Sequence, residues 1–334
     1  MKKATFLVSL FLILQRTVLC LLKTGNILLV DHLNINHEIN RHDLVKAFYF
    51  DTLGMTADPR KHENLDRGRK TLWANSGINQ FHLPEDERAQ VFDGVITLSC
   101  IDGECLADIE RKLSNPPSIL KDGTRFSWRK SAEEQELHVT DPWGSMFKLI
   151  VNPDAFDARG VQPEGDKSIL CAMSDLCVHV PKDASIPGIA RFYDQVFGAP
   201  CLDCNENEVK IITSPQQTLT FRRVAEDVNV EQSELKQDDE GMANYGPHIS
   251  MYVTNFSDIY EKAEKVGSLF VNHRFKRRAY TLDEAKKQCM FRTLDVVDPE
   301  NISAGSIIKL EHEVRSVITI EGKKYKSCPF HEVI

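Results

Sequence analysis

The strand-like stretch Val30-Asp31-His32-Leu33-Asn34-Ile35 sets the organisation of this 334-residue chain. A helix-like segment follows it and closes with Phe48-Tyr49-Phe50-Asp51-Thr52-Leu53-Gly54. The same order returns 144 positions later, as Asp175-Leu176-Cys177-Val178-His179-Val180 and then Phe192-Tyr193-Asp194-Gln195-Val196-Phe197-Gly198. A repeat at this spacing is long enough to be a whole domain rather than a small solenoid unit. The sequence therefore predicts two related domains.

Each copy of the repeat also divides into two similar halves. In the first copy, residues 78–84 close one half, and a strand at 94–100 with a helix at 104–113 opens the next. That second half ends in an Asp141-Pro142 turn before a strand at 146–151. The matching segments of the second copy are a strand at 248–253, a helix at 257–266, an Asp298-Pro299 turn and a strand at 307–310. The pattern predicts four βαβββ half-units and an α+β fold.

These motifs, taken together, resemble the vicinal oxygen chelate superfamily, which contains glyoxalases, bleomycin-resistance proteins and extradiol dioxygenases. The shared features are a strand that begins Asp-His, a helix that ends Phe-Tyr-x-x-x-Leu-Gly, and an Asp-Pro turn before the last strand. The resemblance covers residues 27–316 and rests on the order and repetition of the motifs. It implies a tandem member with two cupped, mixed-sheet domains. We place these domains at 27–152 and 169–316, with a linker at 153–168 and a tail at 317–334.

The composition narrows the possible partners. The chain carries 41 Lys and Arg against 49 Asp and Glu, a formal charge of −8. Nucleic-acid-binding proteins usually show a basic footprint, so the charge argues against a nucleic-acid partner. A small-molecule substrate or ligand is the partner that the resemblance implies.

The first residues read as a targeting segment. Met1-Lys2-Lys3 precedes an apolar run that is interrupted at Gln15 and Arg16, which is typical of a signal peptide and short for a membrane span. We predict a signal peptide at 1–22 and entry into the secretory pathway or a plastid-type organelle, with a cytoplasmic location as the alternative. The mature chain is expected to have no stable membrane span.

The resemblance implies where a divalent metal would bind. Superfamily members take one ligand from the first strand of a half-unit and one from its last strand, and the metal stabilises an oxyanion of the substrate. Those positions fall, in order along the four half-units, on His32 and His82, Val95 and Lys148, Leu176 and Thr220, and His248 and Lys309. Three histidines are competent ligands, whereas Val95 and Leu176 are not.

Two pairings of the half-units give two different sites. Pairing within each domain would leave His32 and His82 in one cup and His248 in the other. Pairing outer with outer and inner with inner would bring all three histidines to one cup with Lys309 beside them. A shift of register on the last strand would replace Lys309 by Glu311. Three imidazoles suit Zn²⁺, Fe²⁺ or Ni²⁺, and Mn²⁺ is a further candidate. No sequence feature selects between the pairings.

Two functions follow from these residues. His32, His82 and His248 favour a metal-dependent lyase, isomerase or dioxygenase that acts on a small oxygenated molecule. The unsuitable ligand positions favour a metal-free binding protein like the bleomycin-resistance members, in which Lys148 and Lys309 would bind an anionic ligand. The sequence assigns no catalytic residue, because a fold by itself does not decide function.

Overall fold

The structure is a computed structural model that describes residues 25–61, 64, 71–131, 135–155, 168–224, 236–237, 243–244 and 246–330. The predicted signal peptide at 1–22 lies outside the described residues, as does most of the predicted linker at 153–168. Within the described ranges, no helix is long and apolar enough to cross a membrane.

The first of two large mixed sheets has nine strands. Its order is β17 (Leu269–Phe270), β18 (Met290–Val297), β19 (Ser306–Ser316), β16 (His248–Val253), β1 (Ile27–Asn34), β5 (Asn79–Asp86), β4 (Thr71–Ser76) and β3 (Thr56–Ala57), and β2 (His37–Glu38) pairs with β5. These strands belong to the first and fourth half-units, so we call this sheet the outer sheet.

The second large sheet has eight strands, all from the second and third half-units, and we call it the inner sheet. Its order is β11 (Cys201–Cys204), β12 (Glu208–Ser214), β13 (Gln217–Arg223), β10 (Ala172–Val180), β6 (Gly94–Cys100), β9 (Met146–Val151), β8 (Glu136–Thr140) and β7 (Ser127–Lys130). A separate pair consists of β14 (Lys236–Gln237) and β15 (Ala243–Asn244).

The structure therefore decides between the two pairings. β1 runs antiparallel to β16 in the outer sheet, and β6 runs antiparallel to β10 in the inner sheet. The predicted α+β fold with two cupped mixed sheets is confirmed. Each half of the sequence contributes strands to both sheets, so the boundaries predicted at 27–152 and 169–316 divide the repeat and not the sheets.

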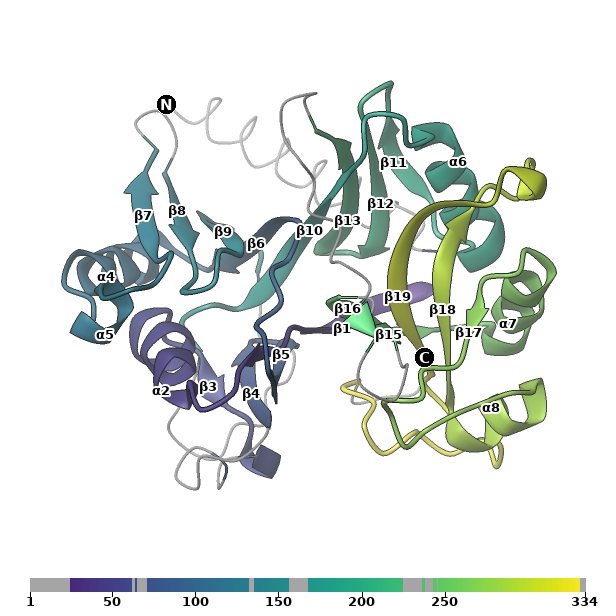
Figure 1. The fold of residues 1–334 in the computed structure, drawn as a ribbon, viewed down its shortest axis with the longest axis horizontal. Helices are drawn as coiled ribbons and strands as arrows, with labels where there is room; N and C mark the ends of the chain where they lie inside the picture. Colours follow the sequence, from purple (N-terminus) through teal and green to yellow (C-terminus); the bar gives the residue numbers. More distant parts are fainter. Residues whose placement is uncertain are drawn as a thin grey trace, which may run out of the picture.

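Helices cover the two ends of the molecule. They are α2 (His42–Val45), the π-helical η1 (Lys46–Thr52), η2 (Pro59–Lys61), α4 (Gly103–Ser114), α5 (Ser118–Lys121), α6 (Ile186–Arg191), the π-helical η3 (Phe192–Phe197), α7 (Phe256–Lys265), α8 (Leu282–Gln288) and η4 (Ile302–Ala304). Figure 1 shows α2, α4 and α5 at one end and α6, α7 and α8 at the other, with strands of both sheets between them.

The repeated Phe-Tyr motif has the same local structure in both copies. Phe48 and Tyr49 lie in η1, and Phe192 and Tyr193 begin η3. In both segments an α-helical turn widens into a π-helix, for example through the Leu53 N–H, which donates to the Phe48 carbonyl five residues earlier (3.0 Å). All four rings are at most 1% exposed, so the motif forms the core, as its position in the repeat predicts.

A buried histidine connects the outer sheet to the helix η3. His312 of β19 faces Tyr193 of η3, whose hydroxyl lies 2.6 Å from His312 Nε2, while the Thr293 hydroxyl lies 3.2 Å from Nδ1. Burial holds the pKa of Tyr193 well above its ordinary value, so its hydroxyl keeps its proton and donates to His312. Burial also lowers the pKa of His312 to about 3.

Acid should destabilise the protein through His312. Below pH 6.5 the unfolded chain binds a proton on this ring, whereas the folded chain does not until about pH 3. The free energy of unfolding should therefore fall by up to about 1.4 kcal/mol per pH unit in that window. Urea unfolding at pH 7, 6 and 5 should show that the free energy of unfolding falls less steeply with decreasing pH in His312→Gln than in the wild type. The exposed His273→Gln variant should follow the wild type, and equal slopes for all three proteins would contradict the assignment.

A glycine sets the approach of the two sheets at the β4–β5 turn. Gly77 has a φ of +57°, and a Cβ at this position would lie 1.6 Å from the Cys171 carbonyl oxygen, just before β10. Only glycine accommodates both the left-handed backbone and this close contact. The turn of the outer sheet thus packs directly on the backbone that leads into the inner sheet.

Gly77→Ala should destabilise the fold by about 3 kcal/mol, because strain and a backbone clash add together. Gly123→Ala is the matched control. Its φ is +70°, but among the described residues no atom beyond the chain neighbours lies within 4 Å of the added Cβ, so only the strain of about 1 kcal/mol applies. Thermal and urea unfolding of both variants would measure the difference. Equal losses would show that the sheets move apart at no cost.

Candidate functional site

A pocket opens on the outer sheet where β1, β16 and β19 lie side by side. Its cavity is about 310 Å³, the lower end of the range for small-molecule sites. The lining residues come from both outer half-units and are Asp31, His32, Asn34, Arg60, Trp73, Gln80, His82, His248, Phe275, Lys276, Arg277, Met290, Arg292, Glu313, Arg315 and Ser327.

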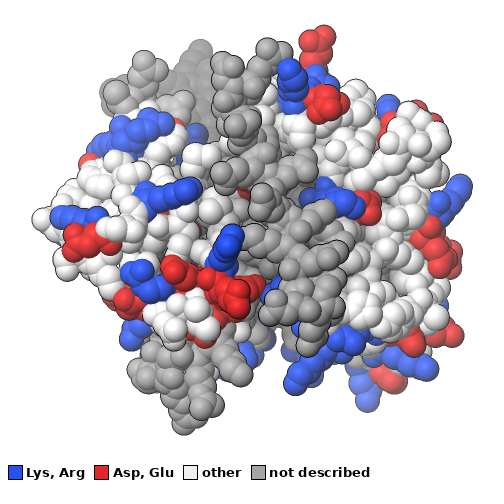
Figure 2. Space-filling view, in the orientation of Figure 1, with Lys and Arg blue, Asp and Glu red and all other residues white. Residues whose placement is uncertain are grey.

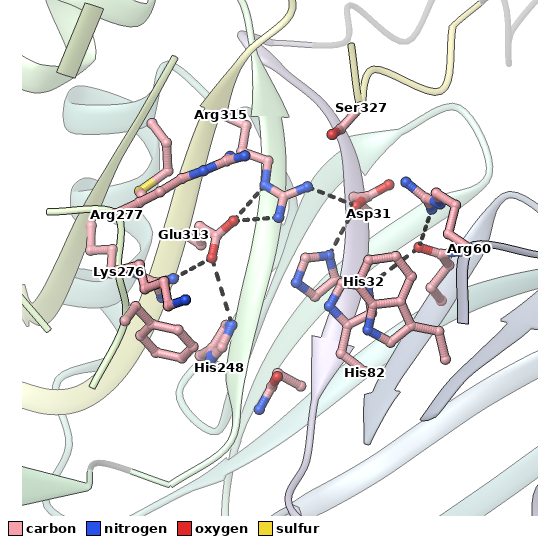
Figure 3. A pocket seen from close by; sticks show the side chains of 16 residues that line it. Asp31, His32, Arg60, His82, His248, Lys276, Arg277, Glu313, Arg315 and Ser327 are labelled. Carbon is pink, nitrogen blue, oxygen red and sulfur yellow. Dashed lines mark hydrogen bonds and ion pairs between the residues drawn. The ribbon is translucent and has the colours of Figure 1, made fainter. Parts of the chain in front are cut away.

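Three ligand-type side chains converge in this pocket (Figure 3). His32 of β1, His248 of β16 and Glu313 of β19 offer atoms that all lie within 4.8 Å of one another. The sheet register explains the convergence. Ser250 pairs with His32 on one side and Glu313 on the other, and His248, two residues earlier, points to the same face. All three residues are buried.

Hydrogen bonding fixes the state of His32. Its Nδ1 donates to Asp31 Oδ2 (2.9 Å), so Nε2 is left with its lone pair for the pocket. Burial lowers the pKa of His32, although the bond to Asp31 acts in the opposite direction. The ring is therefore neutral at neutral pH, which is the form that binds metals.

His248 is also a neutral imidazole. Burial, and then the nearby Arg292, hold its pKa well below the ordinary value. Its Nε2 lies 3.9 Å from Glu313 Oε2, and the ring meets Phe275 edge-on with 5.4 Å between centroids. The aromatic contact and the neighbouring strands hold the ring toward Glu313.

Two arginines hold Glu313 ionised. Arg315 contacts Glu313 Oε1, and Arg292 contacts Glu313 Oε2 and Glu311 Oε1. Burial opposes ionisation of Glu313, but the charges of Arg315 and Arg292 outweigh it and hold the pKa well below the ordinary value. Arg315 also reaches Asp31 Oδ2 at 3.5 Å. The carboxylate thus has the charge that a metal ligand needs and already has two cationic partners.

His82, the other histidine on the first half-unit's ligand strands, lies beside this group. Its ring stacks on His32 with 3.6 Å between centroids, and Trp73 stacks on it with 4.3 Å between centroids. Its Nε2 lies 3.4 Å from Gln80 Oε1. The nitrogen lone pairs of an imidazole lie in the plane of the ring. In two stacked rings these lone pairs run parallel, so His32 and His82 do not both point at one metal ion.

The two lysines expected at ligand positions lie elsewhere. Lys148 is on β9 of the inner sheet and pairs with Glu136. Lys309 is near the start of β19, is 41% exposed and pairs with Asp295 at 2.6 Å. Neither is among the residues that line the pocket. The structure brings His32, His82 and His248 together and leaves both lysines outside that group.

Sequence reasoning missed Glu313, Arg292 and Arg315. Glu311 and Glu313 were both expected on the last strand, but only Glu311 was named as the alternative ligand to Lys309; β19 runs from Ser306 to Ser316. Glu311, Glu313 and Arg315 alternate along this strand and so share one face, whereas a register irregularity between Lys309 and His312 puts Lys309 out of phase with them. The alternation of Glu311 and Glu313 is the signal that could have added Glu313 to the ligand candidates.

The pocket concentrates positive charge. Five basic residues line it (Arg60, Lys276, Arg277, Arg292 and Arg315), against the acidic Asp31 and Glu313. The whole chain has a formal charge of −8, and acidic and basic side chains are interspersed over the face in Figure 2. A cleft with this local excess attracts anions.

Comparisons with solved structures match this architecture. A candidate dioxygenase from Bacillus subtilis subsp. subtilis strain 168 aligns with a TM-score of 0.52 at 10% identity, over 93% of this chain and 92% of that one. This chain has the vicinal oxygen chelate fold. A glyoxalase I variant from Zea mays aligns at 0.47 and 11% identity, over 88% and 94% of the two chains. The 2,3-dioxygenase LapB from Pseudomonas sp. KL28 aligns at 0.30 and 10% identity, over 88% and 93%.

At 10% identity the similarity to the Bacillus subtilis protein concerns the fold and not an activity. Scans of protein-family models and of curated proteins return no match to this sequence. Function has to be argued from the chemistry of the pocket. Two neutral imidazoles and one ionised carboxylate form a donor set that fits a divalent transition metal.

The double ion pair of Arg292 should be essential to stability. Arg292 is 4% exposed, and its removal would leave Glu311 and Glu313 with less compensation in a buried site. Arg292→Met should lower the free energy of unfolding by about 3–5 kcal/mol. Arg222→Met is the control, because Arg222 is half exposed and its pair with Glu208 should be worth less than about 1 kcal/mol. A wild-type unfolding midpoint for Arg292→Met would contradict this reading of the pocket.

Proposed function

We propose that this protein is a metal-dependent enzyme of the dioxygenase class that acts on a small, anionic, oxygenated molecule. The observation that supports it is the convergence of His32, His248 and Glu313 from three adjacent strands in one buried pocket. Two histidines and one carboxylate on one side of an ion, with its other positions open, are typical of non-haem iron(II) oxygenases.

The ion would be held by His32 Nε2, a nitrogen of His248 and the Glu313 carboxylate. Fe²⁺ and Mn²⁺ suit this mixed set best, whereas Zn²⁺ and Ni²⁺ are the alternatives. A bound ion would supply Lewis acidity toward neighbouring oxygen atoms of a substrate. Asp31 orients His32 for this role through the hydrogen bond to Nδ1.

The arginines of the pocket would recognise the negative charge of the substrate. Arg315 and Arg292 border the same carboxylate, and their planar guanidinium groups suit paired contacts with a carboxylate or phosphate. Arg60 lies across the pocket, with its guanidinium 4.7 Å from the Trp73 ring centroid. In a substrate that carries an acidic group beside its reactive oxygens, the arginines would bind the acidic group and the ion would bind the reactive oxygens.

His82 would accept a proton from the substrate. It lines the pocket next to His32, and its ring is clamped between His32 and Trp73. A clamped imidazole keeps its orientation, which a proton acceptor needs. Trp73 would also provide an apolar face for a planar substrate.

A second candidate function is metal-free binding of an anionic small molecule. The specific observation in its favour is that Glu313 already has two guanidinium partners, which compete with a metal for its oxygens. In that case Arg292 and Arg315 would complete the pocket, and the histidines would be hydrogen-bonding groups.

Metal content should separate the two functions. Tag-free wild-type protein, loaded with Fe²⁺ under anaerobic conditions and desalted, should hold the ion in this pocket. His32→Ala and His248→Ala should each lower the affinity by about 100-fold or more, because each removes one of three ligands. His82→Phe keeps the stack and should retain the ion. Elemental analysis of the four proteins measures this.

The controls define what each result means. Loss of metal in His82→Phe alone would move the ligand role from His32 to His82. If the metal content of His32→Ala and of His248→Ala equals that of the wild type, the pocket does not bind the ion, and metal-free binding is left as the function. Oxygen uptake with dihydroxybenzoates, compared with unsubstituted catechol, then tests the reaction class and the need for an acidic group. Uptake that is faster with catechol would contradict the role of the arginines.

A further inference from the structure

A second histidine group lies away from the pocket. His37 is on β2, His42 is the first residue of α2, and Glu85 is near the end of β5. β2 pairs with β5 so that His37 stands opposite Glu85. Glu85 has the same parity along β5 as the core residues Phe81 and Leu83, whereas Gln80 and His82 line the pocket. The group is therefore separate from the pocket.

The ligand atoms of this group are as close as ligands of one ion. His42 Nδ1 lies 2.9 Å from Glu85 Oε1 and 3.3 Å from His37 Nε2, and all three atoms lie within 4.8 Å. A ring nitrogen has either one lone pair or one hydrogen, so His42 Nδ1 cannot bond fully to both neighbours. Ligands at about 2.0–2.1 Å around a tetrahedral zinc ion lie about 3.3 Å apart, which matches these separations.

Hydrogen bonds within the described residues do not satisfy this group. His37 Nδ1 and His42 Nε2 are buried and have no hydrogen-bond partner there. These are the second nitrogens of the two rings and point away from the shared ligand atoms, so the argument for an ion rests on the close approach of His37 Nε2, His42 Nδ1 and the Glu85 carboxylate.

The carboxylate of this group is better placed for a metal than Glu313. Glu85 contacts His42 and accepts the Asn40 N–H at 3.2 Å. In the described part of the chain no guanidinium pairs with Glu85, in contrast to the two that hold Glu313. The Glu85 and His42 side chains are only 15% and 10% exposed, which leaves little room for a substrate beside an ion held between them.

We propose that His37, His42 and Glu85 form a second metal site, which binds Zn²⁺ and has a structural role. The ion would join β2, the start of α2 and the end of β5. The ion would thus cross-link the segment that follows β1 to the end of β5 and stabilise the first half-unit. The site does not depend on the proposed function of the pocket.

Zinc titration of the metal-free full chain tests the site. Competition with a chromophoric chelator should give one tight ion in a His32→Gln, His248→Gln double variant, in which the pocket is disabled. Adding His42→Gln or Glu85→Gln to that variant should weaken zinc binding by at least about 100-fold. Adding His273→Gln, at an exposed histidine, should leave it unchanged. Zinc should also raise the unfolding temperature of the double variant, and His42→Gln should abolish this rise.

The outcomes are distinct for the two sites. A double variant that binds no zinc, or one whose zinc affinity survives both His42→Gln and Glu85→Gln, would overturn the second site. A wild type that binds a single ion, lost with His42→Gln and kept with His32→Gln, would support the second site and reject the pocket as a metal centre. Circular dichroism of each variant identifies a misfolded protein, and Glu85→Gln then replaces His42→Gln as the deciding variant.

Discussion

The antiparallel ladder between β1 and β16 is the interaction on which the rest of the structure depends. It pairs Ile27 with Val253 and Asn34 with His248, which join the first and last half-units of the repeat. Without this ladder His32 and His248 would stand in separate sheets. Pairing between segments so far apart in sequence closes a large loop, so the outer sheet forms only when both ends of the repeat have been made.

The two sheets differ in what they bury at the matching positions. On the inner sheet Val95, Cys177 and Thr220 lie in register, whereas Leu176 pairs with Ile96 and points to the opposite face. Asp175 there accepts hydrogen bonds from Thr218 (2.6 Å) and Thr220 (2.8 Å). Its polar groups are thus satisfied locally. The outer sheet instead gathers opposite charges around Glu313, where each buried charge needs its partners to remain ionised. Among the described residues, the groups that could hold a metal ion therefore lie on or beside the outer sheet.

Local patterns explain why so much of the fold could be predicted. The alternation of β1 and the Phe-Tyr helix ends depend on residues that are neighbours in sequence, and these elements were found close to their predicted positions. His32 and His248 were also found, because each lies on the first strand of a half-unit that the repeat defines. The helix-like segments that close with the Phe-Tyr motif were predicted, but their π-helical turns were not, because no local pattern specifies them.

The sequence by itself determined the four half-units, the α+β class and the histidines that a metal would need. Only the tertiary structure decided that the outer half-units share a sheet, that Glu313 rather than Lys309 or Glu311 faces the histidines, and that Arg292 and Arg315 border it. The physical reason is that strand identity follows from side chains two residues apart, whereas strand partners and register follow from packing between distant segments. A shift of two residues along β19 keeps the same face of the strand, so alternation alone cannot say which carboxylate lies opposite Ser250.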